Sequence, residues 1–368
     1  MLSKTNAVVL CFGALIGGSV LADHDPAKLS KMLKTDGPLP ENRPKIAHVN
    51  MGGTIAWKAP SPLLYFNYTG HERYTPAEIV NLVPEVHRIA DIQIVEAPPE
   101  GIDQVDMPKA AKIVMAALAR PDVVGAVVPT GTWALEEVAY FLHLTVKSDK
   151  PVVVTGSQRP PNTYSSDAHA NYYNAVRLAI DPQAKGKGVL VLLNDEINSA
   201  RDVTKSAISR LQTFRSREFG PLGSTDADQV VFYRAPMRKH TYMNEFDIAR
   251  YTSIKDLPRV DIVHGCRGCD DALIKAAVAA GAKGIVVATM GDGWLPEIET
   301  ALKDAAKSGV VVVRSSRVGE NRVTPWHRYD GVFVSGDNLL PQKARLLLAL
   351  ALTKTNDVNQ VQKFFDEY

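Results

Sequence analysis

Two hydroxyl side chains lie where a parallel sheet would bind a ligand. Thr130 and Thr132 flank Gly131, directly after the apolar run Val123–Pro129 and before the helix-like segment Ala134–Thr145. Open α/β sheets bind ligands at the carboxyl ends of their strands, beside helix N-termini. A Thr hydroxyl placed there can attack a carbonyl group once a base removes its proton. Helix capping is the ordinary alternative for such a Thr.

A lysine can supply that base. Lys205 ends the segment Ala200-Arg201-Asp202-Val203-Thr204-Lys205, which follows the strand-like run Gly188–Asn194. A lysine amine beside a Thr hydroxyl can accept its proton or lower its pKa, whereas an isolated lysine is usually just solvated. The sequence therefore makes Thr132 and Lys205 candidate catalytic residues.

Glycines accompany these groups. Gly52-Gly53-Thr54-Ile55 follows the strand-like run Ile46–Asn50, and backbone without Cβ atoms can approach a ligand closely. The amide N–H groups of this segment and of Gly131 could stabilise an oxyanion, and Thr54 offers a further hydroxyl. A glycine pair after a strand can also form an ordinary tight turn.

The elements that position these residues alternate between strand-like and helix-like segments. Short β-branched runs are followed by amphipathic segments of helical length, which is typical of βαβ units and a parallel sheet. The first series has strands at Ile46–Asn50, Val123–Pro129, Val152–Gly156 and Gly188–Asn194, and helices at Met107–Ala119, Ala134–Thr145 and Asn171–Ala179. The second has strands at Val260–His264, Gly284–Thr289 and Val310–Ser315, and helices at Asp271–Ala280, Leu295–Ser308 and Leu340–Leu352.

The polar stretch His240–Pro258 separates the two series. The sequence therefore predicts an α/β fold with a larger N-terminal parallel-sheet domain over residues 45–239 and a smaller C-terminal α/β domain over residues 259–368. Residues 240–258 are predicted to be the linker between them. Long-period repeats and low-complexity tracts are absent from the sequence, which excludes solenoid and disordered classes.

Size and charge exclude further classes of protein. The 368 residues are 45% hydrophobic, enough to bury the cores of two domains. The 42 basic side chains nearly balance 40 acidic ones, giving a net charge of +2. Because no basic run alternates with aromatic residues, we expect no binding of nucleic acid.

Residues 1–22 predict an export signal. Lys4 supplies a positive charge, Ala7–Gly18 an apolar core, and Val20-Leu21-Ala22 a small-residue cleavage site. A membrane anchor is the alternative, but this apolar run is shorter than the ~20 residues that cross a bilayer, and no later segment is long enough. We expect an exported, periplasmic protein whose mature chain opens with an exposed lead-in over residues 23–44.

Export leaves two cysteines, Cys266 and Cys269, because Cys11 lies within the signal segment. An even pair in an oxidising compartment favours a disulfide. His264 and Asp270 could complete a metal site, but zinc sites usually draw their ligands from two separated clusters. We therefore expect a disulfide and no metal ion.

The order and spacing of many segments resemble those of the bacterial type II L-asparaginase/glutaminase family over nearly all of the mature chain. The matching segments lie in both predicted domains. They are Ser157–Pro160, Asn171–Ala175, Gly188–Val191, Asn194-Asp195, Arg201–Lys205, Gly220–Gly223, Arg238–Thr241, Val313–Val318 and Pro341–Arg345. The resemblance implies a homotetramer, built as a dimer of dimers, that hydrolyses the side-chain amides of asparagine or glutamine to the acid and ammonia without a cofactor.

The chain departs from the family at positions that should carry its chemistry. Met51 stands where the motif Thr-Gly-Gly-Thr-Ile has its leading, nucleophilic Thr. In the motif His-Gly-Thr-Asp-Thr, the active Thr corresponds to Thr132, but Trp133 replaces the Asp. Lys205 matches the catalytic lysine. The resemblance thus implies one surviving Thr–Lys pair and two lost groups.

A third departure lies in the loop that binds the substrate. The family's Gly-Ser-Gln-Asp-Met corresponds to Asp103-Gln104-Val105-Asp106-Met107, with a register uncertain by one residue. By this resemblance Met51, Gln104 and Trp133 are expected to line the pocket. An indole in place of a carboxylate removes a partner for the substrate ammonium group but could stack on an apolar or cyclic ligand.

Two hypotheses follow. The first is a diverged amidohydrolase, in which Thr132 attacks an amide carbonyl and Lys205 accepts its proton. The second is a binding protein that keeps the fold and the assembly without catalysis. Retention of Thr132 and Lys205 favours the first, and replacement at positions 51 and 133 favours the second.

Overall fold

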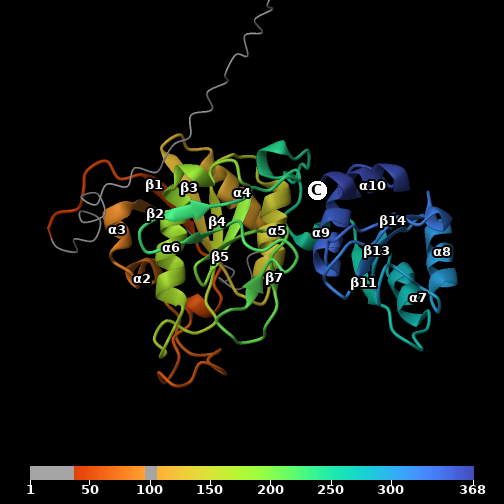
Figure 1. Ribbon diagram of the computed structural model, residues 1–368, viewed down its shortest axis with the longest axis horizontal. Coiled ribbons are helices and arrows are strands. Elements are labelled where there is room, and N and C mark those ends of the chain that lie inside the picture. Colours follow the sequence, from red (N-terminus) through yellow and green to blue (C-terminus); the bar gives the residue numbers. More distant parts are fainter. Residues whose placement is uncertain (1–36, 96–105) are drawn as a thin grey trace, which may run out of the picture. The chain divides into compact units, whose positions relative to one another are not determined.

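The computed structural model describes residues 37–95 and 106–368 (Figure 1). The compact unit Pro38–Tyr368 contains two α/β domains, each with its own main sheet. The first sheet has the strand order β10-β9-β6-β5-β4-β3-β1-β2. Its strands are β1 (Lys45–Val49), β2 (Asp91–Val95), β3 (Val123–Pro129), β4 (Val152–Thr155), β5 (Val189–Leu193), β6 (Glu196–Ser199), β9 (Gly223–Thr225) and β10 (Val230–Phe232).

Helices cover both faces of the parallel part of this sheet, formed by β1 to β5. Side chains alternate between the faces: Ala126 and Val128 of β3 pack into one core and Val127 into another. Strands buried on both faces need continuous apolar runs, which explains why β3 is so rich in valine. The helices are α2 (Pro76–Asn81), α3 (Val86–Ile89), α4 (Met107–Leu118), α5 (Leu135–Thr145) and α6 (Ala168–Ile180).

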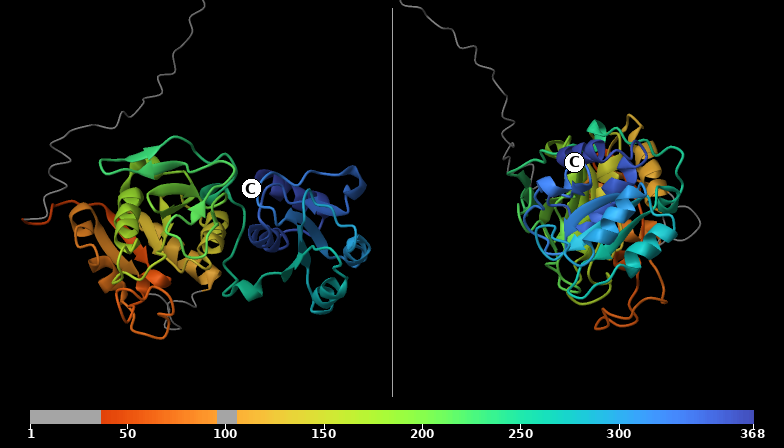
Figure 2. Two further views of the ribbon diagram at one scale, coloured as in Figure 1. Left: turned by 60° about the horizontal axis from the view of Figure 1, so that its bottom comes forward. Right: turned by 90° about the vertical axis from the view of Figure 1, so that its right-hand side faces the viewer.

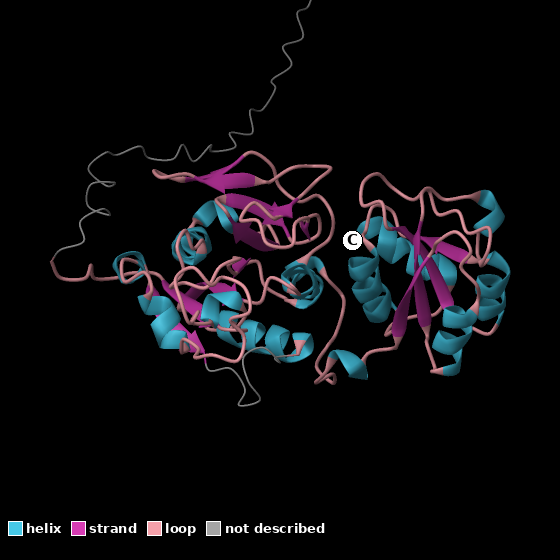
Figure 3. Cartoon of the chain, turned by 90° about the horizontal axis from the view of Figure 1, so that it is seen from below, coloured by secondary structure: helices cyan, strands magenta, loops and turns pink. Residues whose placement is uncertain are grey.

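The second sheet is parallel throughout, with the order β11-β12-β13-β14. Figure 3 shows helices on both sides of its strands, and Figure 2 shows the same group of elements at the blue end of the colour bar. Ile285 and Val287 of β12 face one core, and Val286 faces the other. The strands are β11 (Val260–His264), β12 (Gly284–Thr289), β13 (Val311–Ser316) and β14 (Phe333–Ser335), and the helices are α7 (Ala272–Ala279), α8 (Glu299–Lys307), α9 (Pro341–Ala351) and α10 (Val358–Glu367).

This architecture confirms the predicted fold class, a larger parallel-sheet domain followed by a smaller α/β domain. The antiparallel strands β6, β9 and β10 were not predicted from the sequence. The helix predicted over Leu295–Ser308 starts later in the structure. Leu295 and Ile298 are buried, as a helix would place them, but α8 begins only at Glu299. The helical spacing of apolar residues therefore extended into a loop that buries its own side chains.

The stretch 240–258, predicted as a linker, is not a loosely attached segment. Phe246, Ile248 and Tyr251 are buried in the core that also contains α5 and α9. Phe246 stacks near the rings of Phe364 and Tyr368, at centroid distances of 5.4 and 5.2 Å. The stretch therefore packs against elements of both domains, and the boundary predicted over residues 240–258 stays a prediction.

The signal peptide predicted over residues 1–22 and the pocket residue Gln104 fall outside the described residues, as does the predicted lead-in over residues 23–44 except for residues 37–44. In the described ranges, 37–95 and 106–368, no helix is both long and apolar enough to cross a membrane.

Candidate active site

Thr132 and Lys205 meet although 73 positions separate them. Thr132 lies in the loop between β3 and α5, and Lys205 lies in the short strand β7 (Thr204–Lys205), which pairs with β8 (Phe214–Arg215). The Lys205 Nζ donates a hydrogen bond of 2.9 Å to the Thr132 Oγ1. Thr132 is buried, with 7% of its surface exposed, so water competes little with this contact. The sequence-predicted pair is therefore a real contact in the fold.

Burial favours the neutral amine form of Lys205. Desolvation lowers the pKa of Lys205 below its ordinary value, and the negative charge of Glu136 acts in the opposite direction. The backbone N–H of Lys205 donates to the Glu136 Oε1 over 3.5 Å. The Gln342 side-chain amide donates to the Oε2 of the same carboxylate over 3.3 Å. Glu136, in the first turn of α5, is a site residue that the sequence did not single out.

The two glycine segments touch each other. A Cβ atom on Gly53, whose φ is +87°, would lie 2.2 Å from the Gly131 Cα. Only glycine fits there, both for the left-handed backbone and for the close approach. The loop after β1 and the loop after β3 are thus packed backbone to backbone beside Thr132.

Gly52 is unsuited to the oxyanion role that the sequence suggested. Its N–H already donates to the Asn50 Oδ1 over 3.0 Å. Met51 is also committed to the framework, because its N–H donates to the Pro129 carbonyl over 2.8 Å and it forms a parallel bridge with Thr130. With 5% of its surface exposed, Met51 is buried just after the carboxyl end of β1, beside the loop that carries Thr132.

A second hydroxyl pair lies in the segment after Gly53. The Thr54 Oγ1 is 2.6 Å from the Tyr68 hydroxyl, and Thr54 is buried. Either oxygen can donate in this contact. Tyr68 follows a loop without a recognisable pattern, so nothing in the residues between positions 54 and 68 indicated this partnership.

Trp133 lies at the surface, with 75% of its area exposed. A Cβ atom on Gly131 would meet the Trp133 Nε1 at 2.6 Å, so the indole lies against the glycine. An aromatic ring held over the loop that carries Thr132 can contact a ligand that reaches Thr132.

Two family models match this chain. The model of the asparaginase N-terminal domain matches residues 45–238, and the model of the glutaminase/asparaginase C-terminal domain matches residues 259–365. The chain belongs to the asparaginase/glutaminase family.

Relatives in this family align over most of the chain. L-asparaginase 2 of Bacillus subtilis is 41% identical, with 99% of this chain and 100% of the relative covered. L-asparaginase 2 of Escherichia coli is 40% identical, with 88% and 93% covered. The solved structure of a probable cytoplasmic L-asparaginase from Campylobacter jejuni has a TM-score of 0.81 at 37% identity and covers 89% of this chain and 99% of its own.

In this member of the asparaginase/glutaminase family, the small domain holds the loop that leads to Lys205. Lys343 of α9 is 1% exposed, and its Nζ donates to the carbonyl oxygens of Ala200 and Arg201 over 2.9 and 2.8 Å, and to that of Val203. Burial lowers the pKa of Lys343 to about 8. One side chain thus fixes three carbonyl groups just before Lys205.

Lys343→Met is expected to lower the free energy of unfolding by about 3 kcal/mol or more, because several buried carbonyl groups lose their donor together. Urea denaturation of the variant measures this, and Lys363→Met, at an exposed position of α10, is the matched control. Equal midpoints for Lys343→Met and wild type would contradict the role of Lys343.

Cys266, Cys269 and Asp270 lie in the loop between β11 and α7, and His264 is the last residue of β11. Cys266 and Cys269 are joined by a disulfide with a Cα–Cα distance of 5.3 Å. Within residues 37–95 and 106–368, no group of three or more His, Cys, Asp or Glu side chains is arranged to hold a metal ion. The predicted export of the protein, and with it the redox state of this pair in its compartment, stays a prediction.

A separate cavity of about 650 Å³ lies apart from these groups. Its lining includes Arg201, Phe219, Arg238 and Asp337, but neither Thr132 nor Lys205. Asp337 already pairs with Arg238 over 2.8 Å. The cavity is therefore not part of the candidate active site as the structure presents it.

Proposed function

We propose that this protein is a diverged amidohydrolase whose working centre is Thr132 with Lys205. The observation that carries the proposal is the 2.9 Å contact between the Lys205 Nζ and the Thr132 Oγ1. A hydroxyl nucleophile needs a base within hydrogen-bond reach, and this is the standard separation for one. The relatives named above are L-asparaginases, so amide hydrolysis is the natural reaction class.

The proposed reaction has two stages. Thr132 gives its proton to neutral Lys205 and attacks the amide carbonyl carbon, and the Gly131 N–H stabilises the oxyanion. The C–N bond then breaks, the Lys205 ammonium returns the proton to the leaving nitrogen, and an ester on Thr132 remains. Lys205 then takes a proton from water, the resulting hydroxide attacks the ester carbonyl carbon, the bond to the Thr132 Oγ1 breaks, and Lys205 returns the proton to that oxygen as the acid leaves. No cofactor is needed for any of these steps.

The preferred substrate is proposed not to be free asparagine. Thioether and indole side chains at positions 51 and 133 offer no carboxylate to an ammonium group, whereas the exposed Trp133 ring suits an apolar or cyclic amide. Hydrolysis of asparagine, glutamine and a panel of blocked and cyclic amides tests the proposal, with Thr132→Ala as the inactive comparison; ammonia release reports on the primary amides and the ring-opened product on the cyclic ones.

Activity is expected to rise with pH as Lys205 loses its proton, with an apparent pKa below the ordinary lysine value of 10.5 because the amine is buried. Glu136→Gln should move this rise to lower pH, since it removes the negative charge that favours the ammonium form. Glu137→Gln is the matched control on the next residue. A kcat/KM profile that Glu136→Gln leaves in place would contradict Lys205 as the base.

A binding protein without catalysis is the alternative. It is favoured by the burial of Met51 at a position where the family's motif has its leading Thr. Under this alternative, a ligand that quenches Trp133 fluorescence would bind without turnover, and Thr132→Ala would leave its affinity nearly unchanged.

The protein is also proposed to be exported to the periplasm and to form a homotetramer. One relative is named a probable periplasmic L-asparaginase, from Haemophilus influenzae, at 38% identity. The segments of the small domain that resemble the family support the same assembly. Light scattering at micromolar concentration is expected to give the mass of a tetramer, and a monomer under those conditions would contradict the assembly.

A further inference from the structure

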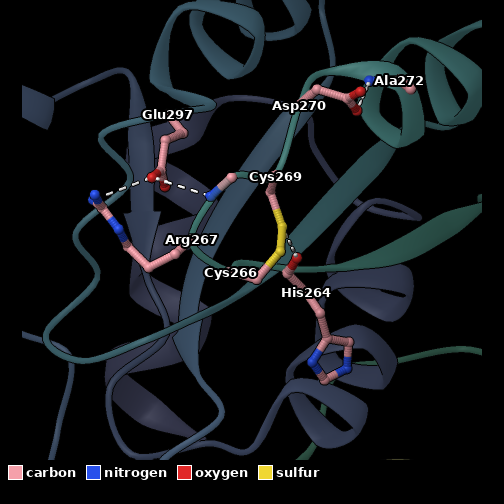
Figure 4. The surroundings of a disulfide bond; sticks show 8 residues. His264, Cys266, Arg267, Cys269, Asp270, Ala272 and Glu297 are labelled. Carbon is pink, nitrogen blue, oxygen red and sulfur yellow. Dashed lines mark hydrogen bonds and ion pairs between the residues drawn. A yellow bond between two sulfur atoms is a disulfide. The ribbon is translucent and has the colours of Figure 1, made fainter.

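A second pair of reactive atoms lies in the small domain, in the loop between β11 and α7. The disulfide of Cys266 and Cys269 spans two intervening residues, Arg267 and Gly268 (Figure 4). The proposed amide chemistry uses neither sulfur. A Cys-X-X-Cys pair that follows a strand and precedes a helix of a βαβ unit is a common arrangement for thiol–disulfide exchange.

The two sulfurs differ in accessibility. Cys266 is exposed, whereas Cys269 is half-buried and packs against the core of the small domain. The Cys269 Sγ also lies 3.7 Å from the His264 carbonyl oxygen, which occupies one side of it. An incoming thiolate therefore reaches Cys266 more readily than Cys269.

Contacts other than the disulfide hold this loop. Glu297 accepts hydrogen bonds from the Gly268 N–H over 3.3 Å and pairs with the Arg267 guanidinium over 3.2 Å. Figure 4 shows this carboxylate between the two donors. Gly268 has a φ of +75°, which allows the turn. The backbone is thus fixed without the sulfur–sulfur bond, so two thiols formed by reduction would stay within reach of each other.

The disulfide is also poorly placed to stabilise the fold. Its sequence separation is 3, so it closes a very short loop. The stabilisation that a disulfide gives by restricting the unfolded chain grows with loop length and is least for so short a loop. Reversible chemistry explains the pair better than structural bracing does.

We propose that Cys266 and Cys269 form a thiol–disulfide exchange site whose co-substrate is a dithiol. A thiolate of the dithiol attacks the Cys266 Sγ, the bond to Cys269 breaks, and the Cys269 thiolate takes up a proton. The second thiolate of the dithiol then attacks the dithiol sulfur that is bonded to Cys266. The bond from that sulfur to Cys266 breaks, and the released Cys266 thiolate is protonated. Two electrons pass to the protein, and the dithiol leaves as a disulfide.

The test uses the full chain in buffers of reduced and oxidised dithiothreitol, and in a second arm reduced thioredoxin as a protein dithiol. Alkylation and peptide mapping separate Cys266 and Cys269 from Cys11. We expect complete, reversible reduction under native conditions with an unchanged circular dichroism spectrum. Reduction by dithiothreitol alone assigns a small dithiol, and reduction by thioredoxin as well assigns a protein dithiol. Resistance to both, or unfolding on reduction, would overturn the proposal.

Single-cysteine variants test the assigned order of attack. With oxidised glutathione, Cys269→Ser, which keeps Cys266, is expected to form the mixed disulfide at least about tenfold faster than Cys266→Ser. Glu297→Gln should slow reoxidation of the reduced wild-type pair, because it weakens the hold on the loop. Equal glutathionylation rates in the two single-cysteine variants would contradict Cys266 as the attacked sulfur. These measurements do not depend on amide hydrolysis.

Discussion

Wild-type protein is expected to hydrolyse L-asparagine at least about 10³-fold more slowly than the ~1–10³ per second of ordinary enzymes. The reason lies in two side chains. Met51 has a thioether, which cannot act as a hydroxyl nucleophile, and it is 5% exposed beside the loop of Thr132. By its resemblance to the family's motif, Trp133 takes the place of an Asp, whose charged hydrogen bond to a substrate ammonium group would contribute ~1.5–3 kcal/mol.

Restoring asparagine hydrolysis is expected to need at least Met51→Thr and Trp133→Asp together. The first supplies a nucleophile and the second a charge for binding, so each single variant should remain nearly inactive. Met51→Val with Trp133→Asp, and Met51→Thr with Trp133→Asn, are matched controls that keep the size and remove the functional group. Ordinary turnover of asparagine by wild type, measured as ammonia release, would show that positions 51 and 133 are not the catalytic positions.

Strands buried on both faces could be predicted closely from the sequence. β3 and β12 begin and end where the apolar runs do, because their nearly continuous apolar pattern reflects burial against two layers. Short or polar strands could not be predicted from the sequence. β6 reads Glu-Ile-Asn-Ser and β14 has only three residues, so neither shows a strand pattern, and their pairing depends on neighbours supplied by the rest of the fold.

The residues of the candidate site also divide into those that the sequence indicated and those that only the fold revealed. Thr132 could be singled out because it lies just after the carboxyl end of the recognisable strand β3, and Lys205 because the segment Arg201–Lys205 resembles the family's. Glu136, Tyr68 and Lys343 could not, since their roles depend on contacts across the chain, such as the 2.9 Å bond from Lys343 to the Ala200 carbonyl. Polar side chains on helices and loops carry no signal of a distant partner until the fold brings the two together.

The second large effect is expected at the surviving pair. Thr132→Ala and Lys205→Met should each lower kcat for the amide that the protein does hydrolyse by about 10³-fold or more, because one removes the nucleophile and the other its base. The double variant should be little worse than either single one, since the two residues act as a unit. Thr132→Ser, which keeps a hydroxyl, should retain measurable activity.

Thr54→Val is the informative control for this prediction. Thr54 is another buried Thr of the site, and its Oγ1 is 2.6 Å from the Tyr68 hydroxyl. Loss of its hydroxyl should reduce activity far less than Thr132→Ala does. The opposite ranking would identify Thr54 as the nucleophile and would contradict the mechanism while leaving membership of the family unaffected.

Amide hydrolysis by purified wild type and Thr132→Ala, compared on the same panel of asparagine, glutamine, and blocked and cyclic amides, tests the central claim most directly. Ammonia release measures the primary amides, and the ring-opened product measures the cyclic ones. The account predicts that wild type is nearly inactive on asparagine, hydrolyses at least one other amide, and loses that activity in Thr132→Ala. An amide hydrolysed equally well by wild type and Thr132→Ala would contradict it, as would the absence of hydrolysis of every amide in the panel.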